Sequence, residues 1–304
     1  MRTPLFSSLM CLLAGAIGAL ASQNPLTAQS LRYSGSLGFS AGAYTFTDRT
    51  ESLALLSGLS FSSGRISLTA TLPIISQNSG DVAFIGGGLM PTGGPGHEGS
   101  MGGHSGNGMG VGGSEPANPT GEGHGSFETT IGDPLFRSSV RLHNGVGTLR
   151  SVSAEVYLKA PVAPVSSGIG TGAWDVGVGS TSVLALGGTI VLAGVSFWSP
   201  GDLPDLVLKE YLGFSFGVGR LLGRRWSLLS SVNLATTVLE TIDPPASAGL
   251  SFGFRPSRGR SLSGGFNVGL TEASPDFTVF LGWSLGFLSP ETGGLPQGGI
   301  NRGL

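Results

Sequence analysis

The most constraining feature of this sequence is a two-residue alternation of apolar and small polar side chains. From Leu31 to Ala43 the odd positions carry Leu, Tyr, Gly, Phe and Ala, while the even positions between them carry Arg, Ser and Gly. Near the C-terminal end, Phe277 and every second residue to Phe287 are large and apolar. Successive side chains of a β-strand point to opposite faces, so the pattern predicts strands with one greasy face and one small, polar face.

The composition argues against an ordinary soluble domain. Charged residues make up 11% of the chain, against about 25% in typical globular proteins. Beyond the N-terminal segment, no long charge-free stretch reads cleanly as a membrane helix. A closed β-barrel is the other fold that satisfies every backbone hydrogen bond in lipid. The sequence therefore predicts an all-β barrel in the outer membrane of a Gram-negative cell, and the net charge of −2 argues against a nucleic-acid partner.

Residues 1–21 predict a secretory signal peptide. Arg2 precedes a short apolar run that reaches Ala19-Leu20-Ala21 before polar residues begin. Cys11 is the one cysteine of the chain and lies inside this segment. The exported protein is therefore expected to have no disulfide and no cysteine-based metal or redox site. Its expected partners are outer-membrane lipids, a small-molecule solute and, during biogenesis, the barrel-assembly machinery.

The alternation predicts one transmembrane antiparallel up-and-down barrel of about twelve strands within residues 30–288. The strands are expected at 31–46, 51–62, 65–76, 133–144, 149–161, 174–185, 189–199, 206–221, 225–238, 246–256, 260–271 and 276–288. Tight turns such as Ser63-Gly64 and Gly187-Gly188 alternate with longer loops, which is typical of barrels whose short turns face the periplasm. All four tryptophans fall near proposed strand ends, where aromatic girdles are found.

Two segments leave alternatives open. Val176 to Trp198 is apolar at both parities, so a membrane helix competes with the hairpin that Gly187-Gly188 favours. Residues 77–132 form a long extracellular loop whose Gly- and His-rich part, 86–125, is expected to be disordered, and residues 289–304 form a flexible tail. His and Met residues in the loop suggest copper or zinc as an alternative, but irregular spacing favours incidental residues, and no metal site or cofactor is predicted.

Four local patterns resemble the outer-membrane transporter family named for the MetA pathway of phenol degradation. They are Leu72-Pro73-Ile74-Ile75, Ile131-Gly132-Asp133-Pro134 with Arg137 and Arg141, Leu158-Lys159-Ala160-Pro161 with Gly168 to Gly172 and Asp175, and Gly269 to Asp276. The resemblance covers most of the chain after the signal peptide. It implies a barrel thought to pass small, often hydrophobic molecules, and it brings no catalytic residues. Ala160-Pro161 departs from the family's Leu-Pro-Thr-Gly, and a tail follows Phe287, where such barrels usually end.

Ionisable and tyrosine side chains in the middle strands form the candidate lumen site. A charge on the lipid face of a barrel costs about 2–4 kcal/mol at the midplane, so these groups are expected to point inward. They act either as a polar constriction that selects the solute or, as the favoured reading, as salt bridges that hold the wall together. The candidates are Arg137, Arg141, Glu155, Tyr157, Lys159, Asp175, Lys209 and Tyr211.

The predicted function is passive passage of small hydrophobic or aromatic compounds across the outer membrane. Small residues such as Ser231, Gly249 and Asn267 share one face of the late strands and leave volume for a cavity or a narrow path. A non-conducting structural or surface-binding barrel is the alternative, and a soluble secreted β-sandwich is a third possibility. An enzyme is not predicted, because three of the four histidines lie in the long loop and His143 lies beside a predicted periplasmic turn.

Overall fold

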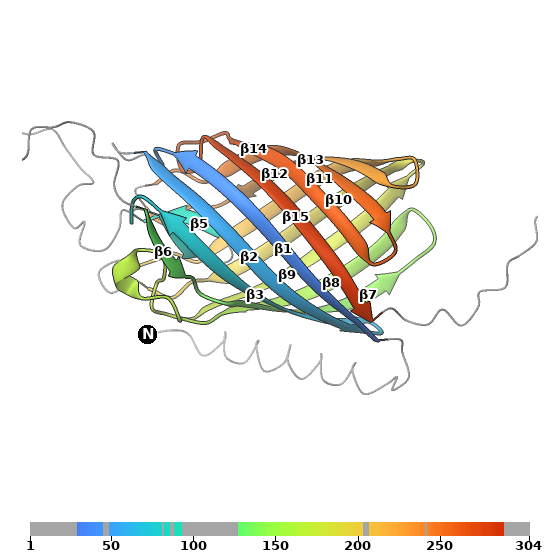
Figure 1. Ribbon diagram of the computed structural model, residues 1–304, viewed down its shortest axis with the longest axis horizontal. Coiled ribbons are helices and arrows are strands. Elements are labelled where there is room, and N and C mark those ends of the chain that lie inside the picture. The colour runs from blue at the N-terminus through green and yellow to red at the C-terminus, as the bar shows by residue number, and fades with distance from the viewer. Residues whose placement is uncertain are drawn as a thin grey trace, which may run out of the picture.

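The computed structural model describes residues 29–44, 49–80, 82–85, 88–92, 127–202, 207–240 and 242–288, which form a closed antiparallel barrel (Figure 1). The predicted signal peptide, most of the Gly-rich stretch and the C-terminal tail lie outside these residues. The wall consists of β1 (Gln29–Gly42), β2 (Thr50–Ser63), β3 (Ile66–Gln77), β7 (Leu135–Asn144), β8 (Leu149–Lys159), β9 (Asp175–Leu186), β10 (Thr189–Ser199), β11 (Tyr211–Leu222), β12 (Trp226–Ala235), β13 (Ala246–Ser257), β14 (Arg260–Gly269) and β15 (Phe277–Leu288).

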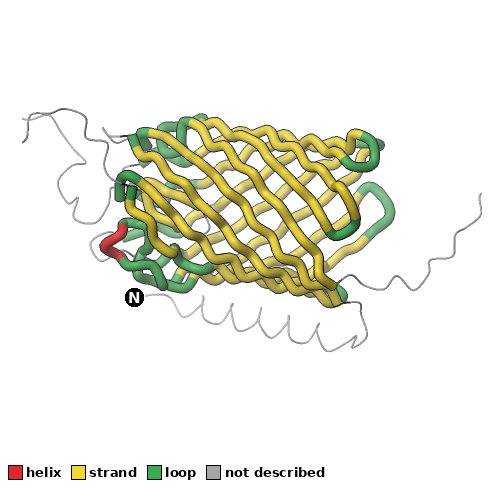
Figure 2. The backbone as a smooth tube through the Cα atoms, in the orientation of Figure 1, coloured by secondary structure: helices red, strands yellow, loops and turns green. Residues whose placement is uncertain are grey.

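Barrel strands pair with their neighbours along the chain, and β1 pairs with β15 to close the wall. Between β3 and β7 the pairing covers Ile66–Thr71 only, and the far end of β3 pairs instead with β6 (Glu128–Ile131). Since β6 extends β7 within the thirteen-stranded sheet, the barrel has twelve strand positions, as predicted. Figure 2 shows the strands running obliquely between two ends that carry the loops and turns.

Side chains divide between the two faces as the alternation predicts. Leu281, Phe216 and Leu262 are all more than half exposed and belong to the outer, lipid-compatible face. The lumen face carries the alternate small and polar residues. Gly35 on the outer face of β1 lies opposite Trp283 of β15, and an added Cβ would come within 2.4 Å of the indole ring. The glycine therefore makes room for the tryptophan.

The turns at one end of the barrel are tight and use glycine where the backbone is left-handed. Gly64, Gly187, Gly223 and Gly259 have φ between 59° and 75°, a region that other residues rarely adopt. The hairpin of β9 and β10 around Gly187 confirms the strand reading of Val176 to Trp198, and the helical alternative is wrong. Both ends of the barrel wall, Gln29 and Leu288, lie at this tight-turn end, which an even strand number requires.

The opposite end holds structure that the sequence pattern did not predict. A hairpin of β4 (Val82–Ile85) and β5 (Gly88–Pro91) forms within the long connection after β3, and a short 3₁₀ helix, η1 (Val165–Ser167), lies in the loop after β8 (Figure 1). Val82, Ala83 and Ile85 are completely buried. The hydrophobic core of the molecule is therefore at this end of the barrel, not along its length.

β11 and β12 are each four residues shorter than predicted, because the loops at this end fold over the opening of the lumen. β11 begins at Tyr211 instead of 206, since Leu208 N–H donates to Asp202 Oδ1 at 3.1 Å and Lys209 N–H donates to the Val238 carbonyl at 2.8 Å. β12 ends at Ala235 instead of 238. These backbone hydrogen bonds hold the loops together and stop both strands before the barrel rim.

Candidate functional site

The β4–β5 hairpin lies across the loop end of the lumen, here called the mouth. Phe84 packs with Ile75 of β3 and the partly buried Ala54 of β2, both of which have lumen parity. Ala83 and Ile85 belong to a cluster with Trp198 of β10 and Tyr211 of β11, on the other side of the barrel. One four-residue strand thus contacts lumen-facing residues on widely separated strands, which places the hairpin over the barrel axis.

Lys159, at the end of β8, fixes the hairpin to the wall. Its ammonium group is fully buried and donates to the carbonyl oxygen of Phe84 at 2.9 Å and to Thr171 Oγ1 at 3.0 Å. It also forms ion pairs with Asp175 at 2.9 Å and Asp133 at 3.2 Å. We call Lys159, Asp133 and Asp175 the buried triad. A buried ammonium is tolerated where carboxylates and further hydrogen bonds surround it.

The two carboxylates of the buried triad tie further loops to the same point. Asp133 Oδ1 accepts hydrogen bonds from the backbone N–H groups of Val162 and Ala163, both at 2.8 Å. Asp175 Oδ1 accepts one from the N–H of Gly201 at 2.9 Å. Phe84 N–H donates to the Ile169 carbonyl at 2.9 Å. Three mouth loops and the hairpin therefore converge on one buried ionic centre.

Aromatic rings line the wall beside the triad. Tyr157 of β8 contacts Trp198 of β10 with ring centroids 5.0 Å apart, and Trp198 stacks on Tyr211 of β11 at 6.4 Å. Trp198 reaches this place because Gly177 of β9 lies opposite, where a Cβ would come within 2.7 Å of the indole. The expectation that all four tryptophans form girdles is wrong for Trp198, which is buried and points inward.

A second ionic group lies next to the aromatic residues, on β7 and β8. Arg137 pairs with Glu155, which also accepts hydrogen bonds from the hydroxyls of Tyr157 and Thr181. The guanidinium carbon of Arg137 lies 5.8 Å from the centre of the Tyr157 ring. The carboxylate is buried, with 1% of its side chain exposed, whereas 46% of the Arg137 side chain is exposed. Arg137 is thus the member of this group that a molecule in the lumen can reach.

Small side chains predominate on the lumen positions of β11 to β14, although Leu229 of β12 also has lumen parity. Asn233, Ser231 and Ser251 are on lumen-parity positions of β12 and β13, and Gly217 and Gly249 flank Ser231 on the neighbouring strands. Ser231 and Ser251 are half-buried and Asn233 is exposed, so no other part of the described chain covers them. Arg32 of β1 also points inward, since its guanidinium donates to Ser284 of β15 at 3.1 Å.

Six of the eight predicted site residues form two groups, and the other two stand apart. Lys159, Asp175 and Tyr211 belong to the packed mouth, and Arg137, Glu155 and Tyr157 form the group below it. Arg141 has lumen parity in β7 opposite Ser153 but joins neither group. Lys209 is not on the wall; it lies in the loop before β11, half exposed, and pairs with Glu240 at 2.7 Å. Its hydrogen bond and its charge lower the pKa of Glu240.

Sequence reasoning missed Asp133, Thr171, Phe84 and Trp198 as parts of this region. Asp133 and Thr171 belong to the patterns that carry the family resemblance, which could have pointed to them. Parity counted from the Gly187 turn would have placed Trp198 inward. Phe84 gave no signal, because a four-residue strand in a long loop has too few positions to show alternation.

Within the described ranges, no cluster of three or more His, Cys, Asp or Glu residues could hold a metal ion. No described helix is long and apolar enough to cross a membrane. The predicted His- and Met-containing loop lies outside the described residues. His143 lies near the tight-turn end of β7, far along the strand from the buried triad.

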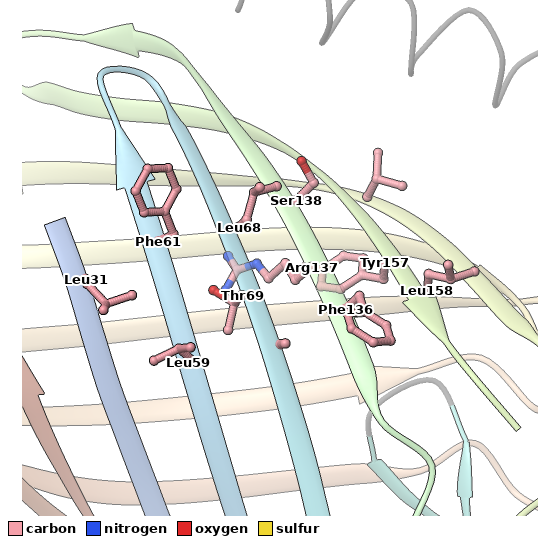
Figure 3. Close-up of a pocket in the computed structure, with 12 residues that line it drawn as sticks. Leu31, Leu59, Phe61, Leu68, Thr69, Phe136, Arg137, Ser138, Tyr157 and Leu158 are labelled. Carbon is pink, nitrogen blue, oxygen red and sulfur yellow. The ribbon is translucent and has the colours of Figure 1, made fainter. Parts of the chain in front are cut away.

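A groove of about 450 Å³ runs over the outside of the wall across β1, β2, β3, β7 and β8 (Figure 3). Its apolar side chains belong to the outer face, including Leu59, Leu68 and Phe136, which are each about half exposed. Thr69, Arg137 and Tyr157 line it from positions of lumen parity. Most of the groove is therefore formed by the apolar outer face of the wall.

Comparison with known proteins supports the fold. No family model matches the chain, and no curated protein matches its sequence. Its structure is similar to that of a COG4313 outer membrane channel from Pseudomonas putida F1, with a TM-score of 0.60 at 13% identity over 87% of this chain and 97% of that one. The translocator domain of the autotransporter NalP from Neisseria meningitidis matches less closely, with a TM-score of 0.44 at 9% identity over 92% and 95%.

A toluene transporter, TodX, from Pseudomonas putida has a TM-score of 0.36 at 9% identity over 88% of this chain and 90% of that one. At these identities the likeness concerns the fold. The resemblance to the MetA-pathway family therefore stays a prediction. The closed twelve-strand wall and its apolar outer face identify this chain as an outer-membrane β-barrel.

Proposed function

We propose that the barrel is a channel for the passive passage of small hydrophobic or aromatic compounds across the outer membrane. The observation that carries this proposal is the wall of small residues below the mouth, represented by Ser231, Gly249 and Ser251. A barrel that serves only as a structural element gains stability by filling its interior with large or paired side chains. Here the ion pairs and stacked rings are concentrated at the mouth, and the lumen positions of β11 to β14 below it carry mainly Gly, Ser and Asn.

The aromatic rings of Tyr157, Trp198 and Tyr211 support the solute class. An aromatic or aliphatic solute can exchange contacts with these rings as it leaves the mouth, and ring pairs of this kind gain about 0.5–1.5 kcal/mol beyond area burial. Arg137 is exposed beside Tyr157 and offers a polar contact to a hydroxyl or carboxylate substituent of the solute.

The hairpin across the mouth favours the second candidate, a non-conducting barrel. The two proposals differ in whether the β4–β5 hairpin can move away from the mouth. We infer that it does, because few hydrogen bonds hold it: Lys159 and the Ile169 carbonyl bind Phe84, and Gln77 donates to the carbonyl of Val82. The channel is then closed when the hairpin is seated and open when it is displaced.

Conductance of the refolded protein in planar bilayers tests the proposal, together with uptake of phenol-sized aromatic compounds into liposomes. We expect a small conductance from the intact protein and a much larger one when residues 82–91 are replaced by a short Gly-Ser linker. The matched control is replacement of the exposed Gly145 to Gly147 turn, which should leave conductance unchanged. If the hairpin-deleted barrel is folded and neither conducts nor admits solute, the non-conducting alternative is correct.

A further inference from the structure

Charge is segregated between the two ends of the barrel. Among the described residues, the tight-turn end carries arginines and no carboxylate; they are Arg65, Arg150, Arg220, Arg224, Arg225, Arg255, Arg258 and Arg260. Most of the described carboxylates lie at the mouth end, on Glu51, Glu128, Asp133, Asp175, Asp202, Glu210, Glu240, Asp243, Glu272 and Asp276. The formal net charge of −2 for the whole chain hides this separation.

Six of the arginines come from two neighbouring turns, and we call them the arginine cluster. Arg220, Arg224 and Arg225 surround the β11–β12 turn, and Arg255, Arg258 and Arg260 surround the β13–β14 turn. The turns are joined because β12 pairs with β13 and the Arg255 N–H donates to the Arg225 carbonyl at 2.8 Å. All six side chains are exposed, and none forms an ion pair with a described residue.

The cluster reaches the edge of the lipid-facing surface through Arg220 and Arg260, whereas Arg225 and Arg255 have lumen parity. Arg220 follows Val218 and Arg260 precedes Leu262 on the outer face, and both apolar neighbours are exposed to lipid. Trp226, half exposed, packs against Phe254 with ring centroids 4.4 Å apart at the same end. Aromatic residues at such a position mark the boundary between acyl chains and headgroups. Long arginine side chains there extend their guanidinium groups to the level of the lipid phosphates.

We propose that the arginine cluster binds the phosphate groups of anionic phospholipids in the periplasmic leaflet. Six like charges without a protein counter-ion repel one another, and an anion that they share removes that repulsion. The planar guanidinium matches a phosphate with two parallel hydrogen bonds, which makes arginine the suitable residue for this contact. The headgroup level at which the cluster lies favours a lipid phosphate over a soluble partner. This surface is distinct from the lumen and does not depend on the transport proposal.

Trp226 provides a local reporter for the test. In the exported protein with Trp174, Trp198 and Trp283 changed to Phe, Trp226 is the remaining fluorophore. Quenching is compared in vesicles of brominated phosphatidylglycerol and of brominated phosphatidylcholine. Each arginine that contacts an anionic surface contributes about fivefold in binding, so we expect at least that preference for phosphatidylglycerol. It should weaken at high salt, because ions screen exposed charges.

Substitutions distinguish binding by the arginine cluster from attraction by the other positive charges at the tight-turn end. Changing all six cluster arginines to Gln should abolish the preference, and changing them to Lys should retain part of it, since a lysine keeps the charge without the fork geometry. The matched control, Arg65→Gln with Arg150→Gln, removes two rim charges outside the cluster and should leave the preference at Trp226 intact. If the fluorescence variant does not fold, native mass spectrometry replaces it. The protein then keeps all its tryptophans, and the amounts of phosphatidylglycerol and phosphatidylcholine that it retains are compared.

Equal quenching by the two lipids around the intact cluster, or equal retention in the mass spectrum, would overturn the proposal. So would loss of the lipid preference in millimolar inorganic phosphate at constant ionic strength, because the site would then belong to free phosphate. Preference that survives the change of all six residues to Gln also contradicts it. Retention by the unchanged and Lys variants with loss in the Gln variant supports it.

Discussion

The mouth and the lower lumen are two parts of one barrel interior with opposite packing. At the mouth, lumen-facing positions hold Lys159, Trp198 and Tyr211, and the β4–β5 hairpin covers them so that they are almost completely buried. Below it, the same alternating positions hold Ser231, Ser251 and their neighbours, and nothing described covers them. Alternation therefore determines which residues face inward, while side-chain size and pairing determine whether the interior is filled.

The largest effect is expected from breaking the packed end at Lys159. Lys159→Met leaves two buried carboxylates without a counter-charge, and loss of one partner of a buried pair costs about 3–5 kcal/mol. We expect a large fall in the urea midpoint, measured by tryptophan fluorescence, and a higher conductance because Phe84 loses its hydrogen bond.

A triple variant distinguishes the effect of buried charge from that of the hydrogen bond between Lys159 and the Phe84 carbonyl. Lys159→Met combined with Asp133→Asn and Asp175→Asn leaves no charge in the buried triad, so most of the lost stability should return. The conductance should stay high, because the contact with the Phe84 carbonyl is still absent. If conductance instead returns to that of the unchanged protein, the ammonium group does not hold the hairpin.

The open part of the lumen is tested by filling it. Ser231→Phe places a ring opposite Gly217 and Gly249 and should reduce conductance severalfold without lowering stability. Ser230→Phe is the matched control, because Ser230 is the adjacent exposed residue on the lipid face of β12. Equal conductance of the two variants would show that the small-residue wall does not line the conducting path.

A smaller effect is expected where the two regions meet, at Arg137. Arg137→Gln removes the exposed positive charge and leaves Glu155 without its ion pair. The reversal potential in a KCl gradient should shift toward cation selectivity, whereas Arg137→Lys should keep the original sign. An unchanged reversal potential in the Gln variant means that permeating ions do not pass this group.

The smallest effect is expected at Lys209, which the sequence placed in the lumen and the structure places on the mouth surface. Lys209→Gln should change neither conductance nor heat stability measurably, because exposed ion pairs contribute little. The pKa of Glu240 is lowered by Lys209, so any contribution is present at neutral pH and is lost as the pH falls through that lowered pKa. A clear change in the ion selectivity of Lys209→Gln would show instead that permeating ions pass close to Lys209.

The wall could be predicted because its information is local. Each strand reports its two faces through neighbouring residues, and glycines such as Gly187 and Gly223 mark the turns, so the strand number and the β9–β10 hairpin followed from the pattern. Strand ends were less accurate. β11 begins later than predicted because its start is set by hydrogen bonds to residues of other loops, which no alternation within the strand records.

The candidate site was predicted in part. Inward assignment of Arg137, Glu155, Tyr157 and Lys159 follows from the cost of charge in lipid, and the structure places all four on the lumen face. The residues that these side chains contact at the mouth could not be predicted. Phe84 and Lys159 are 75 positions apart in the chain, and the loop residues that complete the mouth show no period of their own.

By itself, the sequence determined the class of the fold, the inner and outer faces of its strands and the tight turns at one end. These features depend on patterns between neighbouring residues, namely the two-residue alternation that lipid imposes on a strand and the glycines of short turns. Only the tertiary structure decided that the mouth is closed by a hairpin on a buried ionic triad, and that six arginines from separate turns form one surface. Both depend on which distant segments meet when the barrel closes, and the free energy of burying charge there is set by those partners rather than by sequence neighbours.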